Sequence, residues 1–223
     1  MKRADALIDW IRVKEELLRK ERLPADGTIN SAAKRCLAQA KDLVKVRTSS
    51  TENIISGYGD SSVILGTGHR LKSRTLSSYL KGADSVHIFV VTIGDGIERA
   101  ASRLMKNGES LEGYILDRIG SFAAESAAEK LEGQLRASYA ARNMSVSRRM
   151  SPGYCDWPVE EQLKLQDILD FSRAGVRLTE NCMMVPKKSI SAILGIGSKG
   201  LFNDAWSRCG RCNKKSCGYR SSA

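Results

Sequence analysis

The stretch from Ser85 to Ile93 constrains the fold of this chain more than any other feature. It reads Ser-Val-His-Ile-Phe-Val-Val-Thr-Ile, and β-branched and aromatic side chains dominate it. Such a run is typical of a buried strand. The Gly-Asp-Gly of residues 94–96 then supplies a turn, and the pattern after it predicts a helix that runs to about Lys106. We therefore expect a sheet that buries this strand.

Helical patterns occupy much of the rest of the chain. A long one covers residues 109–142, two amphipathic ones cover residues 4–22 and 28–44, and a further helix is predicted at residues 158–171. Because strands and helices do not alternate regularly, the expected class is α+β, a single domain with a twisted antiparallel or mixed sheet flanked by helices. The expected core positions of three helices are Leu7, Ile11, Leu17, Leu18, Cys36, Leu37, Ala40, Val44, Leu111, Ile115, Ile119, Phe122 and Ala123.

The composition is typical of a soluble globular protein, with 42% hydrophobic and 27% charged residues. No apolar run approaches the ~20 residues that cross a bilayer, and Asp5 precedes any apolar run of the kind found in a signal peptide. We therefore expect a cytoplasmic protein that has no membrane partner. The expected domain covers residues 1–197, with the N-terminal helices included, and a basic, Cys-rich tail covers residues 198–223.

The net charge of +11 is concentrated at the two ends of the chain. Residues 1–50 carry 12 basic and 7 acidic side chains, and residues 187–223 carry 8 and 1. A basic end can attract nucleic acid, but the N-terminal region mixes both signs, as on the solvated face of a helix. Aromatic residues make up 6% of the chain, and no basic stretch is interleaved with stacking rings. Nucleic-acid binding is therefore the least favoured function.

The loop at residues 149–154, Arg-Met-Ser-Pro-Gly-Tyr, has the most specific binding chemistry. The fork of Arg149 matches a carboxylate with two charge-assisted hydrogen bonds, and Ser151 is held extended by the proline after it. Gly153 lets a ligand approach the backbone, and Tyr154 offers a flat apolar face with a polar tip. The loop suits a ligand that carries an amino-acid carboxylate and a flat ring, such as S-adenosylmethionine.

The Arg-x-x-x-Gly-Tyr pattern at residues 149–154 resembles the S-adenosylmethionine-binding motif of the activation domain of cobalamin-dependent methionine synthase. Residues 175–191 are similar to that family's segment of Leu-Thr-Glu, Met, Pro and Ser-x-Ser, and residues 117–125 resemble its long helix. The similarity covers roughly residues 88–197. Three segments in the family's order are more specific than the loop alone.

The resemblance implies a function in the repair of cobalamin. In the family, the domain binds S-adenosylmethionine and docks over an oxidised cobalamin, which one electron and the sulfonium methyl return to methylcobalamin. Arg149 would hold the carboxylate, while Ser151, Gly153 and Tyr154 would meet the adenosyl part. Glu125 would meet the ammonium group or the ribose hydroxyls. Cobalamin would be carried by a partner, a methionine synthase or another corrinoid protein, and an electron donor would be needed.

The sequence departs from the family after Ser191. The family has a Tyr just after its Ser-x-Ser segment, whereas Ile193 and Leu194 stand here and offer no hydroxyl. An alternative function is therefore that of a non-catalytic corrinoid-protein adaptor or chaperone that has lost S-adenosylmethionine binding. The family's ligand-binding Asp near its N-terminal end has no assigned counterpart, although Asp9 is one candidate.

Three of the six cysteines, Cys209, Cys212 and Cys217, lie close together in the tail. Their Cys-x-x-Cys spacing can hold one metal from a single loop, and the lysine and arginine residues around them favour the thiolate. Spacing alone does not separate zinc from an iron–sulfur cluster. The alternative is a reduced basic tail without a metal.

Overall fold

The computed structural model describes residues 7–21 and 27–202 of the 223 residues. Contacts along the chain divide it into two compact units, which are described separately. The first takes the described residues of Met1–Thr48, Val90–Leu131 and Phe171–Ile190, and the second those of Ser49–Phe89, Glu132–Asp170 and Ser191–Ala223. Each unit therefore draws on three separate stretches of sequence.

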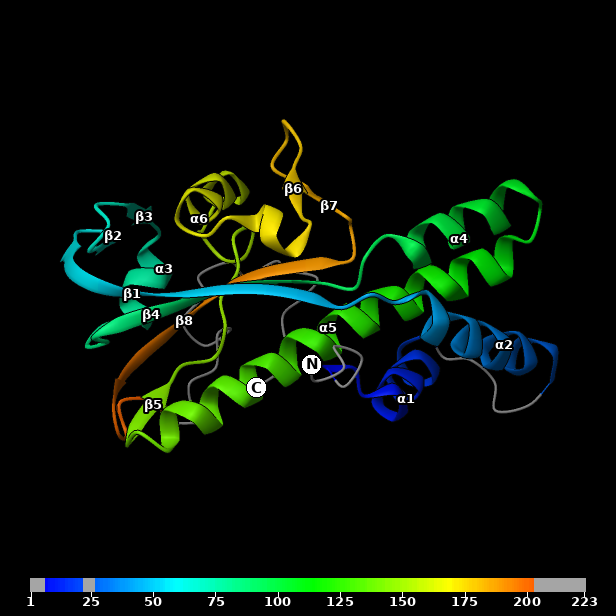
Figure 1. The fold of residues 1–223 in the computed structure, drawn as a ribbon, viewed down its shortest axis with the longest axis horizontal. Coiled ribbons are helices and arrows are strands. Elements are labelled where there is room, and N and C mark those ends of the chain that lie inside the picture. Colours follow the sequence, from blue (N-terminus) through cyan, green and yellow to red (C-terminus); the bar gives the residue numbers. More distant parts are fainter. Residues whose placement is uncertain (1–6, 22–26, 203–223) are drawn as a thin grey trace. The chain divides into compact units, whose positions relative to one another are not determined.

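Helices dominate the first unit. It contains α1 (Trp10–Lys20), α2 (Gly27–Leu43), α4 (Gly96–Lys106) and the first part of α5 (Ser110–Ala140). Figure 1 shows α4 folded against the start of α5 as a helical hairpin. The two helices approach closely, because a Cβ at Gly113 of α5 would lie 3.0 Å from the carbonyl oxygen of Ala101 in α4. The predicted helices at 28–44 and 109–142 are confirmed, with ends that differ by one or two residues.

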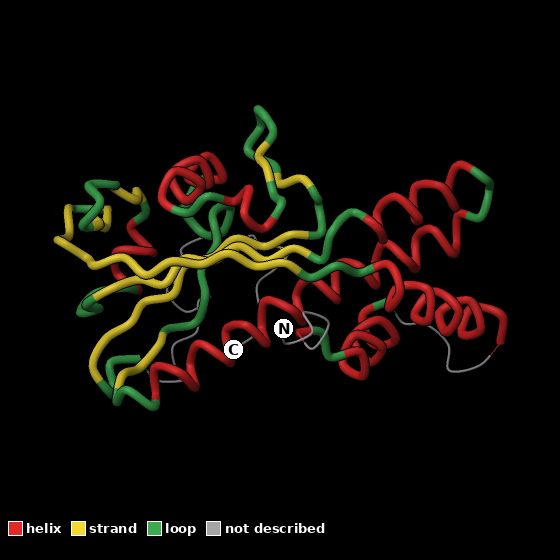
Figure 2. Tube along the Cα trace, in the orientation of Figure 1, coloured by secondary structure: helices red, strands yellow, loops and turns green. Residues whose placement is uncertain are grey.

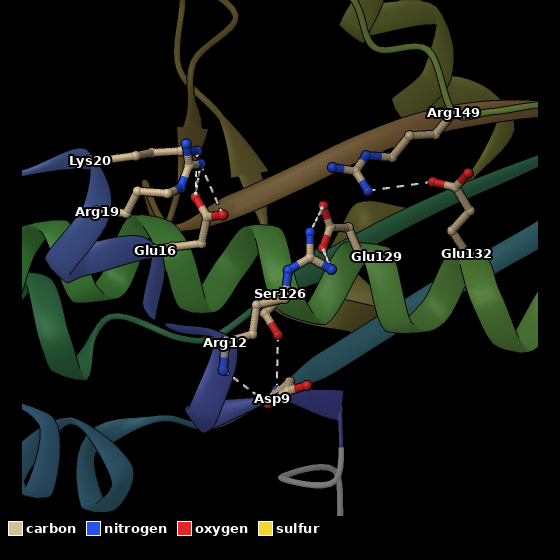
Figure 3. Close-up of polar contacts among 9 residues, drawn as sticks. All are labelled: Asp9, Arg12, Glu16, Arg19, Lys20, Ser126, Glu129, Glu132 and Arg149. Atoms are coloured by element: carbon tan, nitrogen blue, oxygen red, sulfur yellow. Dashed lines mark hydrogen bonds and ion pairs between the residues drawn. The ribbon is translucent and has the colours of Figure 1, made fainter. Parts of the chain in front are cut away.

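A side-chain cap and a tertiary hydrogen bond fix the start of α1. The Asp9 carboxylate accepts from the backbone N–H groups of Ile11 and Arg12, each at 3.1 Å. Its own backbone N–H donates to Ser126 Oγ on α5 at 2.9 Å (Figure 3). Val13 is then buried, and Ile11, two residues before it, is 74% exposed. The expectation that Ile11 lies in the core is wrong, because residues two apart on a helix do not share a face.

The buried stripe of α5 starts later than the sequence pattern predicts. Leu111 is 42% exposed, since it lies in the first turn of α5, at the tip of the hairpin. Its expected core position is therefore wrong. The other expected core positions that are buried are Leu17, Cys36, Leu37, Ala40, Val44, Ile115, Ile119, Phe122 and Ala123.

The first unit ends in short elements after residue 170. A 3-10 helix at Phe171–Ala174 is followed by two strands, β6 (Arg177–Leu178) and β7 (Met184–Val185), which pair antiparallel. Lys188 comes next, and its carbonyl accepts a hydrogen bond from the Ile93 backbone N–H at 3.1 Å.

Most of the second unit is a six-stranded sheet with the order β3-β2-β1-β4-β8-β5. Figure 2 shows its longer strands in yellow. The pairs β1/β2, β2/β3 and β5/β8 are antiparallel, and the expected α+β class with helices flanking the sheet is confirmed. The strands are β1 (Arg47–Gly59), β2 (Ser62–Leu65), β3 (Arg70–Lys72), β4 (Ser85–Thr92), β5 (Met144–Val146) and β8 (Ser189–Ser198).

The strand that the apolar run predicts is β4, and it lies inside the sheet. All of its residues are buried except His87, which is half-buried. The predicted strand at 85–93 is therefore confirmed, because this run can satisfy its backbone and its apolar side chains together only between two neighbouring strands.

The helices of the second unit are short, and one of them is shorter than predicted. The unit contains α3 (Arg74–Tyr79), which the sequence analysis missed, and α6 (Gln162–Ile168). The helix predicted at 158–171 is confirmed only for Gln162–Ile168: a 3-10 turn at Val159–Glu161 precedes α6, and Leu169 ends α6 with φ −124° and ψ 112°. An extended residue of this kind stops the i to i−4 hydrogen-bond ladder.

Candidate functional site

Two hydrogen-bonded neighbours fix the backbone of Arg149. Before it, the Ser147 N–H donates to the Gly195 carbonyl at 2.9 Å, and after it Met150 exchanges hydrogen bonds of 2.9 and 2.8 Å with Ile193. The segment that leads into the 149–154 loop is thus held along β8. The Arg149 side chain is 10% exposed, so its guanidinium lies largely away from water.

Glu132 of α5 contacts Arg149. Its Oε2 lies 3.4 Å from Arg149 Nη1, and Figure 3 shows the two side chains directed toward one another. The other oxygen, Oε1, accepts from Arg136 one turn later on the same helix at 2.9 Å. Glu132 is 14% exposed. Solvent therefore screens the contact between Glu132 and Arg149 only weakly, whereas the Arg136 side chain is 35% exposed.

Arg136 also holds the chain just before Arg149. Its Nη1 donates to the Val146 carbonyl, and its Nη2 donates to the Ser147 carbonyl at 2.8 Å. These two carbonyls lie in the segment that carries Arg149. The last turns of α5 therefore position both the arginine and the acid that it contacts.

The loop beyond Arg149 is a series of tight turns. The Tyr154 N–H donates to the Ser151 carbonyl at 3.3 Å, and the Gly153 N–H donates to the Trp157 carbonyl at 2.8 Å. Gly153 has φ +91°, a conformation that favours glycine. A Cβ at Gly153 would meet only Val159 Cβ, at 3.9 Å, so the backbone there is open. The Tyr154 side chain is 43% exposed.

Asp156 and Trp157 anchor the end of this loop. The Asp156 carboxylate accepts from Ser73 Oγ at 2.7 Å and from the backbone N–H groups of Arg74 and Thr75 at 2.8 and 3.1 Å, which caps α3. Burial raises the pKa of Asp156, but the hydrogen bonds from Thr75 and Ser73 outweigh it and lower the pKa below its usual value. Trp157 is 1% exposed. The loop is therefore fixed at both ends, and Tyr154 lies between them.

The structure brings together four of the five residues that the sequence singled out. Arg149, Ser151, Gly153 and Tyr154 follow one another in the second unit, whereas Glu125 belongs to the first unit and its side chain is exposed on α5. The sequence analysis missed Glu132. No spacing pattern in the sequence would have found it, because Glu132 lies on α5 seventeen positions before Arg149.

Two residues of β8 occupy the region where the family has its Tyr. Ile193 and Leu194 are buried, and Ile193 bridges to Met150, the residue next to Arg149. Upstream on the same strand, the Ser191 hydroxyl donates to the side-chain carbonyl of Gln162. This part of β8 therefore contributes packing beside the loop, and neither Ile193 nor Leu194 supplies a hydroxyl.

The proposed metal ligands Cys209, Cys212 and Cys217 lie outside the described residues. Within residues 7–21 and 27–202, no group of three or more His, Cys, Asp or Glu side chains is arranged to hold a metal ion. None of the helices in that part of the chain is long and apolar enough to span a membrane.

Comparison with known proteins identifies the family. The family model described as "Vitamin B12 dependent methionine synthase, activation domain" matches residues 71–202, which is more than half of the chain. The chain belongs to this family. The match includes the whole of the 149–154 loop, so the resemblance of the Arg-x-x-x-Gly-Tyr motif to the activation domain family is confirmed.

A solved structure shares the fold of this activation domain family member. It is titled "Crystal Structure of the MetH Reactivation Domain bound to AdoHcy", with a TM-score of 0.60 and 18% sequence identity. The match covers 85% of this chain and 74% of that chain. No curated protein matches the sequence.

Proposed function

We propose that this chain binds S-adenosylmethionine through the 149–154 loop and supports the reductive methylation of cobalamin carried by a partner protein. The observation that carries the proposal is the buried guanidinium of Arg149, fixed at the start of the motif by the Ser147 and Met150 backbone bonds. Membership of the activation domain family supports it. The related MetH reactivation domain was crystallised with AdoHcy, the demethylated form of the same ligand.

The residues of the loop fit the ligand's chemical groups. The guanidinium of Arg149 suits the carboxylate, and the exposed ring of Tyr154 suits the flat adenine. Gly153 has no side chain and little around it, so a ligand can approach its backbone. Ser151 adds a hydroxyl beside these groups. The ligand itself supplies an activated methyl group on its sulfonium sulfur.

The chain contributes mainly by holding groups in place. Positioning two reactants converts a bimolecular step into an effectively unimolecular one. Arg149, on a segment fixed by β8 and α5, would set the position of the ligand's amino-acid end. No general acid or base is required by this role.

Cobalamin and the electron come from partners in this proposal. The cobalamin is bound by a methionine synthase or another corrinoid protein, and a separate donor supplies one electron. Cys209, Cys212 and Cys217 are proposed as a zinc or iron–sulfur site that assists docking or electron delivery. The proposed location is the cytoplasm.

Titration calorimetry with S-adenosylmethionine tests the binding step. Arg149→Gln should weaken binding at least tenfold, because a charge-assisted hydrogen bond contributes roughly 1.5–3 kcal/mol. Arg148→Gln is a matched control, since Arg148 is the neighbouring arginine and its side chain is exposed. Wild-type protein that shows no saturable binding would instead support the adaptor function.

A reconstitution assay tests the chemical step. The protein is mixed with a cob(II)alamin-loaded corrinoid protein, a reductant and S-adenosylmethionine, and the visible spectrum is followed. Methylcobalamin should form in the complete mixture and not when the protein or S-adenosylmethionine is omitted. Equal formation without the protein would contradict the proposal.

A further inference from the structure

The Glu132 carboxylate lies beside the Arg149 guanidinium. It contacts Arg149 at 3.4 Å and Arg136 at 2.9 Å, and the Glu132 side chain is largely buried. We propose that Glu132 receives the α-ammonium group of the ligand while Arg149 receives the carboxylate. Glu132 would then set a preference for ligands with an intact amino-acid end, an inference that rests on the proposed binding of S-adenosylmethionine.

The charges of the pair complement those of an amino acid. An α-amino acid places a positive and a negative group on one carbon, and the Arg149–Glu132 pair offers a negative and a positive group side by side. The contact between them is 3.4 Å, longer than the ~2.7–2.9 Å of a strong charge-assisted bond. The Arg149 guanidinium can form a two-pronged contact with a ligand carboxylate in exchange for this one.

Glu132 retains a fixed position during such an exchange. Arg136 binds its Oε1, and the same guanidinium donates to the Val146 and Ser147 carbonyls. An ionised carboxylate has about four acceptor positions, so Oε2 can accept from an ammonium group while Oε1 stays with Arg136. A group on a rigid helix, supported by a second charged residue, discriminates better than one on a mobile loop.

Glu132 also supplies a repulsive element. A ligand that keeps its carboxylate and lacks the ammonium would place a negative charge near Glu132 without the positive group that offsets it. Discrimination commonly combines an attractive contact to the correct ligand with repulsion of the wrong one. The preference for the amino group should therefore depend on the charge of Glu132.

The test is a thermodynamic cycle in which two ligands are each combined with wild-type and variant protein. Titration calorimetry measures the affinity of each combination. The ligands are S-adenosylhomocysteine and its deaminated analogue, S-adenosyl-4-thiobutyrate, which retains the carboxylate. The wild-type protein should bind S-adenosylhomocysteine about ten- to a hundredfold more tightly than the analogue, as expected for one charged hydrogen bond. Glu132→Gln should reduce this ratio to below about threefold.

Glu129→Gln is the matched control, since Glu129 lies on the same helix and pairs with Arg12 on α1. It should keep the wild-type ratio. If the Gln variant does not fold, Glu132→Asp is the alternative variant. It keeps the charge but shortens the side chain, and it should partially lower the ratio of the two ligand affinities. A wild-type ratio near one, or a ratio unchanged in a folded Glu132 variant, overturns the inference and leaves the proposed function standing. Failure of the wild-type protein to bind either ligand or S-adenosylmethionine contradicts the proposed function instead.

Discussion

The hydroxyl of Tyr139 on α5 donates a hydrogen bond to Glu52 Oε2 on β1 at 2.7 Å. Burial raises the pKa of Glu52, but the hydrogen bonds from Tyr139 and Ser85 outweigh burial and lower the pKa, so this carboxylate is ionised and can only accept. His87 Nδ1 lies 3.1 Å from the same hydroxyl oxygen. Because a tyrosine hydroxyl has one proton, which goes to Glu52, the His87 proton must lie on Nδ1.

This arrangement predicts a pH-dependent stability. Burial lowers the pKa of His87 below its usual value of 6.5, although the nearby charge of Glu52 opposes the shift. Below pH 6.5 the unfolded chain therefore takes up a proton that the native state still excludes. The free energy of unfolding should fall as the pH drops below 6.5, by at most about 1.4 kcal/mol per pH unit for one proton. Urea unfolding from pH 5 to pH 8 measures it.

His87→Gln should flatten this dependence between pH 5 and pH 6.5, because the buried imidazole is then gone. His69→Gln, which changes the other histidine of the chain, serves as the control. A slope that persists in His87→Gln and disappears in His69→Gln would contradict the assignment.

Asp156→Asn should loosen the 149–154 loop. The substitution keeps the size of the side chain but replaces one of the two oxygens that accept hydrogen bonds from Ser73, Arg74 and Thr75. The loss of a cap of this kind costs about 1–2 kcal/mol. The expected result is a lower free energy of unfolding together with weaker S-adenosylmethionine binding, both measured on the same protein.

Asp167→Asn provides the comparison for Asp156→Asn. Asp167 lies on α6 in the same unit and is exposed, so its replacement should change stability by less than about 0.5 kcal/mol. Equal effects of the two substitutions would show that the α3 cap has no special role.

A helix or strand could be predicted from the sequence where its own pattern of apolar residues indicates which face is buried. The apolar run at β4 and the stripe of α5 specify their elements locally, and both were found. The position of Ile11 was not predictable in the same way, because the packing of α1 involves contacts distant in sequence, such as the bond from the Asp9 N–H to Ser126 on α5. The break at Leu169 likewise depends on packing that single-sequence patterns do not contain.

The residues proposed to bind the ligand could be identified from the sequence only in part. Arg149, Ser151, Gly153 and Tyr154 lie within six residues, so the side chains that suit one ligand stand together in the sequence. Glu132 is seventeen positions before Arg149, and Arg136 ties the end of α5 to the Val146 and Ser147 carbonyls of the segment that carries Arg149. No spacing rule relates an acid in a helix to an arginine beyond the next strand.

Two glycines of α5 should respond in opposite directions to the same substitution. At Gly113 an added Cβ would lie 2.6 Å from Met105 Cγ and 3.0 Å from the Ala101 carbonyl oxygen, both in α4. Overpacking of this kind costs about 1–3 kcal/mol, more than the gain in helix propensity. A Cβ added at Gly133 would meet no atom within 4 Å, so Gly133→Ala should stabilise the protein by about 0.5–1 kcal/mol. Thermal unfolding of the two variants should show a lower midpoint for Gly113→Ala and a higher one for Gly133→Ala, and a rise in both would contradict close packing of α4 on α5.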